Sequence, residues 1–133
     1  MKLEHVAINT LQPQAILDFY TTHFDAKIET WVSEEVPGLT LYFLNFGDGC
    51  RLEVETLSEG THGSPSAKER IGIAHLAFLC TSKEELIAKT KALEEAGVTV
   101  TLQPTDYEGD FFESACLGPD GNLVELTVGK EYL

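Results

Sequence analysis

One short sequence pattern occurs twice along the chain, and this repeat constrains the fold more than any other feature. Each copy begins with a histidine that is followed two residues later by alanine, and each ends with a glutamate that follows an Asp-Gly turn. His5 precedes Glu53 by 48 residues, and His75 precedes Glu125 by 50. The motifs read His-Val-Ala-Ile (5–8) with Asp-Gly-Cys-Arg-Leu-Glu (48–53), and His-Leu-Ala-Phe (75–78) with Asp-Gly-Asn-Leu-Val-Glu (120–125).

The predicted secondary structure repeats in the same way. Alternating apolar residues between turn signals predict strands. One helix is expected to begin at Pro13, and the other to follow the capping box of Ser82 and Glu85 and to end at Gly97. Each half therefore reads β-α-β-β-β. The expected strands span residues 3–9, 27–32, 39–46 and 51–56 in the first half and 73–80, 98–102, 111–117 and 123–128 in the second.

The length of the chain favours one domain built from the two halves. At 133 residues it has the size of an ordinary domain, whereas either half alone would bury too little apolar surface to fold stably. We expect module 1 at residues 1–57, a linker rich in Ser, Gly and Thr at 58–72, and module 2 at 73–133. The fold class is thus α+β, with two βαβββ modules that share an interface.

Composition excludes several classes of partner. The net charge is −13, from 22 acidic and 9 basic residues, and such a surface repels phosphate backbones and anionic lipids. No apolar run approaches the roughly 20 residues that a membrane-spanning helix needs. The three cysteines are an odd number without Cys-x-x-Cys spacing, which suits a reducing cytoplasm. We expect a cytoplasmic protein that acts on a small molecule, without nucleic acid or membrane partners.

The repeated histidines and glutamates are the candidate metal ligands. Two imidazoles and two carboxylates that converge would suit a divalent ion such as Zn, Ni, Co, Mn or Fe. The alternative is that each histidine packs in the core and each glutamate faces solvent, but recurrence in register across the repeat favours His5, Glu53, His75 and Glu125 as ligands. Glu55 is a competing candidate, because it lies on the same strand face as Glu53. Glu53 is preferred because it follows its Asp-Gly turn at the same spacing as Glu125.

The whole chain resembles the vicinal oxygen chelate superfamily, and within it glyoxalase I-like (lactoylglutathione lyase-like) proteins. The resemblance rests on the two His-bearing strands, an aromatic run at 18–20 and the terminal Pro-Asp-Gly-Asn-Leu-Val-Glu-Leu at 119–126. It implies paired βαβββ modules around a cupped sheet, a homodimer, and lyase or isomerase chemistry through an enediolate of a substrate with vicinal oxygens. It also implies a metal held by the four residues above, with Glu125 doubling as the catalytic base.

The chain departs from the glyoxalase I pattern where glutathione would bind. Asn9 stands where an arginine is common, and Glu55-Thr56-Leu57-Ser58 replaces the usual Asn-Trp pair after the first glutamate. These residues do not favour an anionic glutathione conjugate as substrate. Glu113 is a further candidate acid or base on a strand that could face the pocket, and a solvent-facing carboxylate is the competing interpretation.

Other functions of the same fold stay open at this point. A thiol transferase of the fosfomycin-resistance type uses two His and one Glu, so Glu53 would be one ligand too many. An extradiol dioxygenase also uses two His and one carboxylate, with iron, and is usually a longer chain. A non-catalytic, antibiotic-sequestering dimer would lack the metal ligands.

Overall fold

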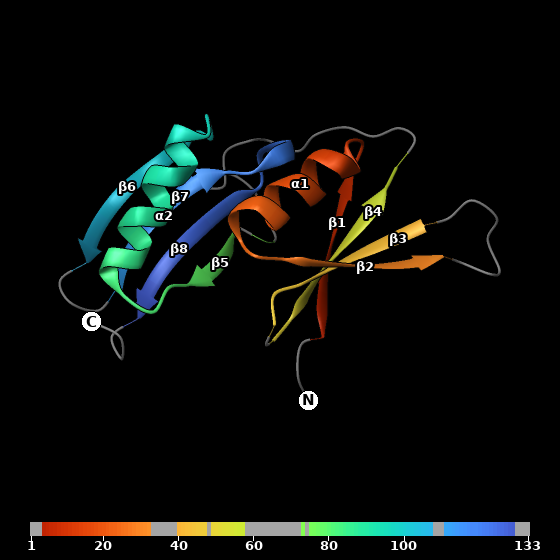
Figure 1. Cartoon of the computed structure of the whole chain (residues 1–133), viewed down its shortest axis with the longest axis horizontal. Coiled ribbons are helices and arrows are strands. Elements are labelled where there is room, and N and C mark those ends of the chain that lie inside the picture. The colour runs from red at the N-terminus through yellow and green to blue at the C-terminus, as the bar shows by residue number, and fades with distance from the viewer. Residues whose placement is uncertain are drawn as a thin grey trace. The chain divides into compact units, whose positions relative to one another are not determined.

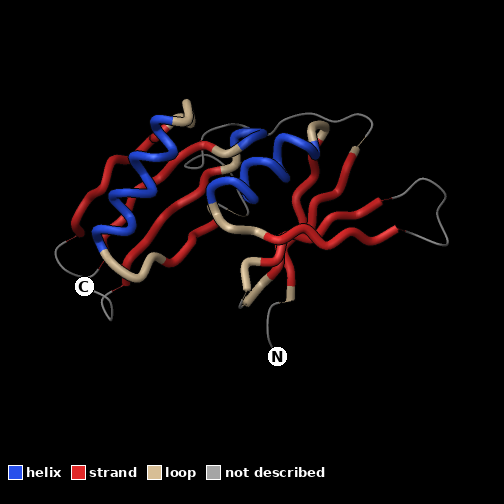
Figure 2. The backbone as a smooth tube through the Cα atoms, in the orientation of Figure 1, coloured by secondary structure: helices blue, strands red, loops and turns tan. Residues whose placement is uncertain are grey.

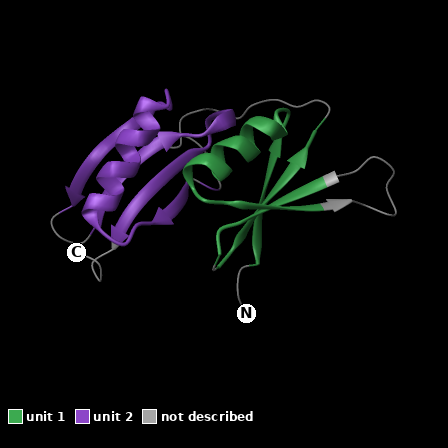
Figure 3. Cartoon of the chain, in the orientation of Figure 1, with its two compact units in different colours: residues 1–61 green, residues 62–133 purple. Residues whose placement is uncertain are grey.

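Two compact units make up the computed structural model. It describes residues 4–32, 40–47, 49–57, 73, 75–107 and 111–129. Unit 1 covers residues 1–61 and unit 2 covers residues 62–133 (Figure 3). The linker expected at 58–72 lies outside the described residues and stays a prediction, as does the organisation of the two modules into one domain.

Unit 1 contains a four-stranded mixed sheet with one helix against it (Figure 1). The strand order is β1-β4-β3-β2, in which β1 runs parallel to β4 and the other neighbours are antiparallel. Ile16 and Tyr20 of the helix are buried, as are Leu44 and Val54 of the sheet. The elements are β1 (His5–Thr10), α1 (Pro13–His23), β2 (Lys27–Val32), β3 (Thr40–Asn45) and β4 (Arg51–Thr56).

Unit 2 again consists of strands (red) and a helix (blue) in Figure 2. Its strand order is β5-β8-β7-β6, which repeats the arrangement of unit 1. Again the first strand is parallel to the last, and the remaining pairs are antiparallel. A short 3₁₀ turn at Pro119–Gly121 leads into the last strand. The elements are β5 (Leu76–Leu79), α2 (Lys83–Glu95), β6 (Val100–Tyr107), β7 (Phe111–Leu117) and β8 (Leu123–Gly129). The expected α+β class and the duplicated βαβββ order are confirmed.

Strand register places the repeated residues at equivalent positions. Ala7 pairs with Glu53 in unit 1, and Ala77 pairs with Glu125 in unit 2. Because side chains alternate between the faces of a sheet, both glutamates project from the face opposite the fully buried valines of the same strands. One face of each sheet therefore packs in a core, and the other carries the candidate ligands. We call this second face the site face.

Several boundaries differ from the sequence predictions, most of all the end of β6 and the start of β5. β6 continues past Pro104 to Tyr107, whereas its predicted end is residue 102. The register shifts twice between Val100 and Thr105, so the proline lies at an irregularity of an edge strand, where a missing N–H donor is tolerated. His75 lies one residue before β5 rather than within it. The Ser82 cap is confirmed, because its hydroxyl accepts from the Glu85 amide (3.2 Å).

Candidate metal site

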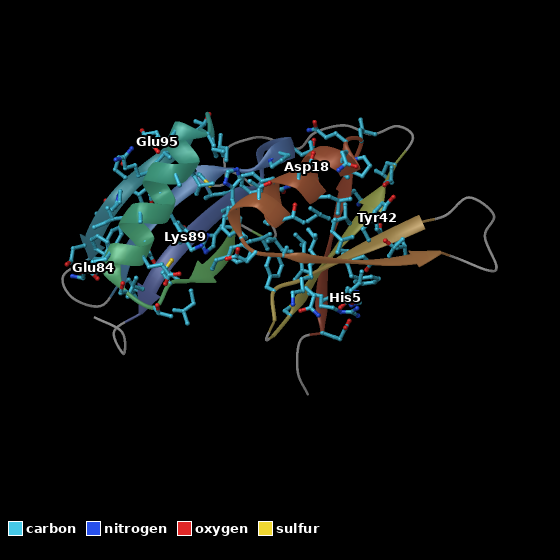
Figure 4. The ribbon with its side chains drawn as sticks, viewed as in Figure 1. His5, Asp18, Tyr42, Glu84, Lys89 and Glu95 are labelled. Carbon is cyan, nitrogen blue, oxygen red and sulfur yellow. The ribbon has the colours of Figure 1, made fainter. Side chains whose placement is uncertain are left out.

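The pair in unit 1 consists of His5 (labelled in Figure 4), at the start of β1, and Glu53, in the middle of β4. His5 Nε2 lies 3.1 Å from Glu53 Oε2. Glu53 is only 8% exposed, while the His5 side chain is 42% exposed. A carboxylate is costly to bury without a partner, so this arrangement favours a bound cation or a proton between the two atoms.

The Glu4 carboxylate is hydrogen-bonded to Nδ1, the other nitrogen of the His5 imidazole. The same carboxylate also contacts the Arg51 guanidinium, whose Nε donates to Glu4 Oε1 (2.8 Å). These hydrogen bonds, first with His5 and then with Arg51, lower the pKa of the Glu4 carboxyl. A carboxylate on Nδ1 fixes the ring so that Nε2 faces Glu53, which is the usual arrangement around a metal-bound histidine.

Sequence reasoning missed Glu4 and Arg51. Their contact joins residues 47 positions apart, and it depends on the parallel pairing of β1 with β4, in which His5 lies opposite Arg51. The adjacent Glu-His pair in the sequence was the available signal. Arg51 also donates from Nη1 to Glu29 Oε2 (3.0 Å), so two carboxylates share its charge.

The pair in unit 2 has the same geometry. His75 Nε2 lies 3.2 Å from Glu125 Oε2, and the Glu125 side chain is 18% exposed. Burial raises the pKa of the Glu125 carboxyl, the electrostatic interaction with His75 opposes this rise, and that with Glu113 adds to it. Glu113 pairs with Thr127 on the neighbouring strand and accepts a hydrogen bond from its hydroxyl (3.2 Å). Glu113 therefore lies on the site face near Glu125.

Each pair fits two positions in the coordination shell of one divalent ion. Two ligands about 2.1 Å from a metal and about 90–110° apart are separated by roughly 3.0–3.4 Å. The separations of 3.1 and 3.2 Å lie in this range. Among the described residues, no group of three or more His, Cys, Asp or Glu side chains is placed to hold a metal. The structure thus brings the predicted ligands together as two pairs, one in each unit.

The sequence profile of the Glyoxalase/Bleomycin resistance protein/Dioxygenase superfamily matches residues 2–126. The chain belongs to this superfamily, and the resemblance to vicinal oxygen chelate proteins is confirmed. None of the functionally curated proteins compared with the chain matches it significantly.

Solved structures share the fold at low sequence identity. A glyoxylase/bleomycin resistance protein/dioxygenase domain from Frankia sp. EAN1pec is 17% identical, with a TM-score of 0.78 over 97% of this chain and 98% of that one. A glyoxalase I mutant from Zea mays is 17% identical, with a TM-score of 0.75 over 95% of this chain and 44% of that one. A mutant of the fosfomycin resistance protein FosX from Listeria monocytogenes, complexed with Mn(II) and 1S,2S-dihydroxypropylphosphonic acid, is 19% identical, with a TM-score of 0.67 over 96% and 89%.

Neither of the two described helices is long and apolar enough to cross a lipid bilayer.

Proposed function

We propose that the protein is a metal-dependent, glyoxalase I-like lyase or isomerase that acts on a small substrate with vicinal oxygens. The observation that carries this proposal is the pair of imidazole–carboxylate contacts at equivalent register positions of two repeated sheets. Four donors of these types suit Zn, Ni, Co, Mn or Fe. In this proposal His5 and Glu53 from one unit and His75 and Glu125 from the other, of the same chain or of a second copy, share one ion.

The chemistry of the proposal divides between the ion and the protein. A divalent ion with open positions acts as a Lewis acid toward neighbouring substrate oxygens and polarises a carbonyl. Glu125 moves a proton between adjacent substrate carbons, a role that a carboxylate with a raised pKa fits. Glu113 supplies a second acid or base on the same face, and Glu4 keeps Nε2 of His5 directed at the ion.

Two further expectations belong to the proposal. The homodimer rests on the resemblance to glyoxalase I-like proteins, and light scattering on the purified protein tests it with an expected mass of twice 14.6 kDa. A reducing cytoplasm is supported by three free thiols, at Cys50, Cys80 and Cys116.

Elemental analysis of untagged protein tests the metal. We expect one of the five ions to copurify, or to bind tightly after reconstitution, and to raise the melting temperature reversibly. The matched variants are His5→Ala and His75→Ala, each of which should abolish tight binding, with His23→Ala as a control outside the two pairs. Protein that holds no metal and binds none on reconstitution would refute the proposal. Full metal affinity in Glu53→Ala would instead favour a three-ligand set.

A catalytic screen with the loaded protein then tests the reaction class. The substrates should carry adjacent oxygens. The readout is isomerisation, and exchange of the migrating proton for deuterium from D₂O reports the proton transfer. Glu125→Gln should lower turnover more than a hundredfold, since general base catalysis contributes about 10²–10⁴. A loaded protein that binds such compounds without turning any of them over would point to a binding module.

A further inference from the structure

A pocket of about 510 Å³ opens on the site face of unit 1, next to the His5–Glu53 pair. Its walls include the apolar side chains of Leu41 and Phe43. The Phe43 ring meets the His5 ring edge-on, with 5.9 Å between centroids. A small molecule in the pocket would therefore lie beside the proposed metal ligands. The lining residues are Glu29, Thr30, Leu41, Phe43 and Arg51.

Arg51 is the cation of this pocket, and its charge is already compensated. The guanidinium binds Glu4 through Nε and Nη2 and binds Glu29 through Nη1, at 3.0 Å. Asn45 fixes the Glu29 carboxylate by a further hydrogen bond of 2.9 Å. The three charged groups sum to −1, so an anionic substrate group would have to displace one carboxylate and approach the other.

The same guanidinium provides a flat surface. Its central carbon lies 4.3 Å from the centroid of the Phe43 ring, which is cation–π distance. Held between two carboxylates and an aromatic ring, Arg51 has a fixed orientation, and planar guanidinium groups stack on flat, unsaturated ligands. The pocket thus joins apolar walls to a planar polar surface in which the arginine charge is compensated.

At the equivalent register positions of unit 2, among the described residues, these groups are replaced. Register places Leu123 where unit 1 has Arg51, and Ala115 where unit 1 has Phe43. The fold is built twice, but the arginine and aromatic pair is present once. The pocket residues are therefore not required by the βαβββ architecture, which favours a role in recognition.

We infer that this pocket binds a flat, uncharged group of the substrate, such as an aromatic ring. Glu29 is then a specificity-determining residue, which excludes anionic groups by occupying Arg51. All residues that line the pocket belong to unit 1, so its preference for flat, uncharged groups does not depend on the metal site. The inference rests on the proposed function only for the identity of the substrate that carries the flat group.

The test uses metal-free protein and two probes that share a phenol ring, p-cresol and 4-hydroxybenzoate, of which only the second carries a negative charge. Titrations followed by ¹H–¹⁵N NMR report on the amides of Leu41 and Phe43. We expect p-cresol to bind about tenfold more tightly than 4-hydroxybenzoate. Glu29→Gln releases a guanidinium donor of Arg51, which can then bind the carboxylate of 4-hydroxybenzoate. The ratio of the two affinities should therefore fall by about threefold or more.

The control is Glu95→Gln on α2 (Figure 4), which removes the same charge elsewhere and should leave the affinity ratio unchanged. It separates a local effect from the general repulsion of anions by a chain of charge −13. Phe43→Ala should abolish the p-cresol shifts at Leu41. Equal affinity of wild type for both probes, equal ratios in the two Gln variants, or no p-cresol shifts would overturn the inference. Because no metal is present, each of these results is independent of whether the proposed metal site exists.

Discussion

Replacing Glu53 by Gln separates metal binding from folding, because the amide keeps the shape of the side chain. Glu53 is 8% exposed, and its Oε2 lies 3.1 Å from His5 Nε2. A Gln amide can donate to that nitrogen, so the free energy of unfolding of metal-free protein should change by less than about 1 kcal/mol. Loss of a charged ligand should weaken divalent-metal binding by about 100-fold, or about 2.7 kcal/mol.

The assay is thermal unfolding with and without saturating metal, together with a competition titration for the metal affinity. Bound metal adds to the free energy of unfolding, and the variant should lose about 2.7 kcal/mol of this contribution. The metal-induced rise in melting temperature should therefore be smaller by roughly 10 °C. Glu55→Gln is the matched control, because Glu55 lies two residues further along β4 on the same face. The reasoning is refuted if Glu55→Gln weakens metal binding as much as Glu53→Gln, or if neither does.

Two further predictions concern the environment of the site and of the core. Glu4→Gln should weaken metal binding by about tenfold without changing the stoichiometry, since Glu4 orients His5 and does not face Glu53. The same competition titration measures the affinity, and an unchanged affinity would contradict the orienting role. Burial raises the pKa of Cys80 and of Cys116 to about 11, so at pH 8 roughly one thiol in 10³ is ionised. Mass-spectrometric mapping of iodoacetamide labelling should therefore find Cys50 modified first, and prompt labelling of either buried cysteine in native protein would contradict this.

Local signals were sufficient to predict the elements of the fold. β2, β4 and β7 have the expected bounds, because alternation of apolar residues is a local pattern and turn residues mark its ends. β6 extends beyond its predicted end at residue 102, because Pro104 is tolerated in an edge strand, and the sequence does not show which strands lie at the edge of a sheet. Strand order and register are long-range properties, and no local pattern encodes them.

The same distinction explains what was predicted of the candidate site. The internal repeat identified His5 and Glu53 as equivalent to His75 and Glu125, and the structure places the two side chains of each pair 3.1 and 3.2 Å apart. That the four residues share one metal stays a prediction. The role of Arg51 could not be predicted, because its partners Glu4 and Glu29 come from other strands. Residues that come together only through strand pairing cannot be identified until the register of the strands is known.

X-ray absorption spectroscopy on metal-loaded, untagged protein, combined with the metal-to-chain ratio, shows whether the two His–Glu pairs hold one ion. We expect one ion per chain, with two imidazole nitrogens and oxygen donors around it. In a His75→Gln variant loaded at excess metal, one imidazole should be lost from the spectrum. Two ions per chain, or an ion with a single imidazole in the wild type, would show that the two His–Glu pairs do not share a metal.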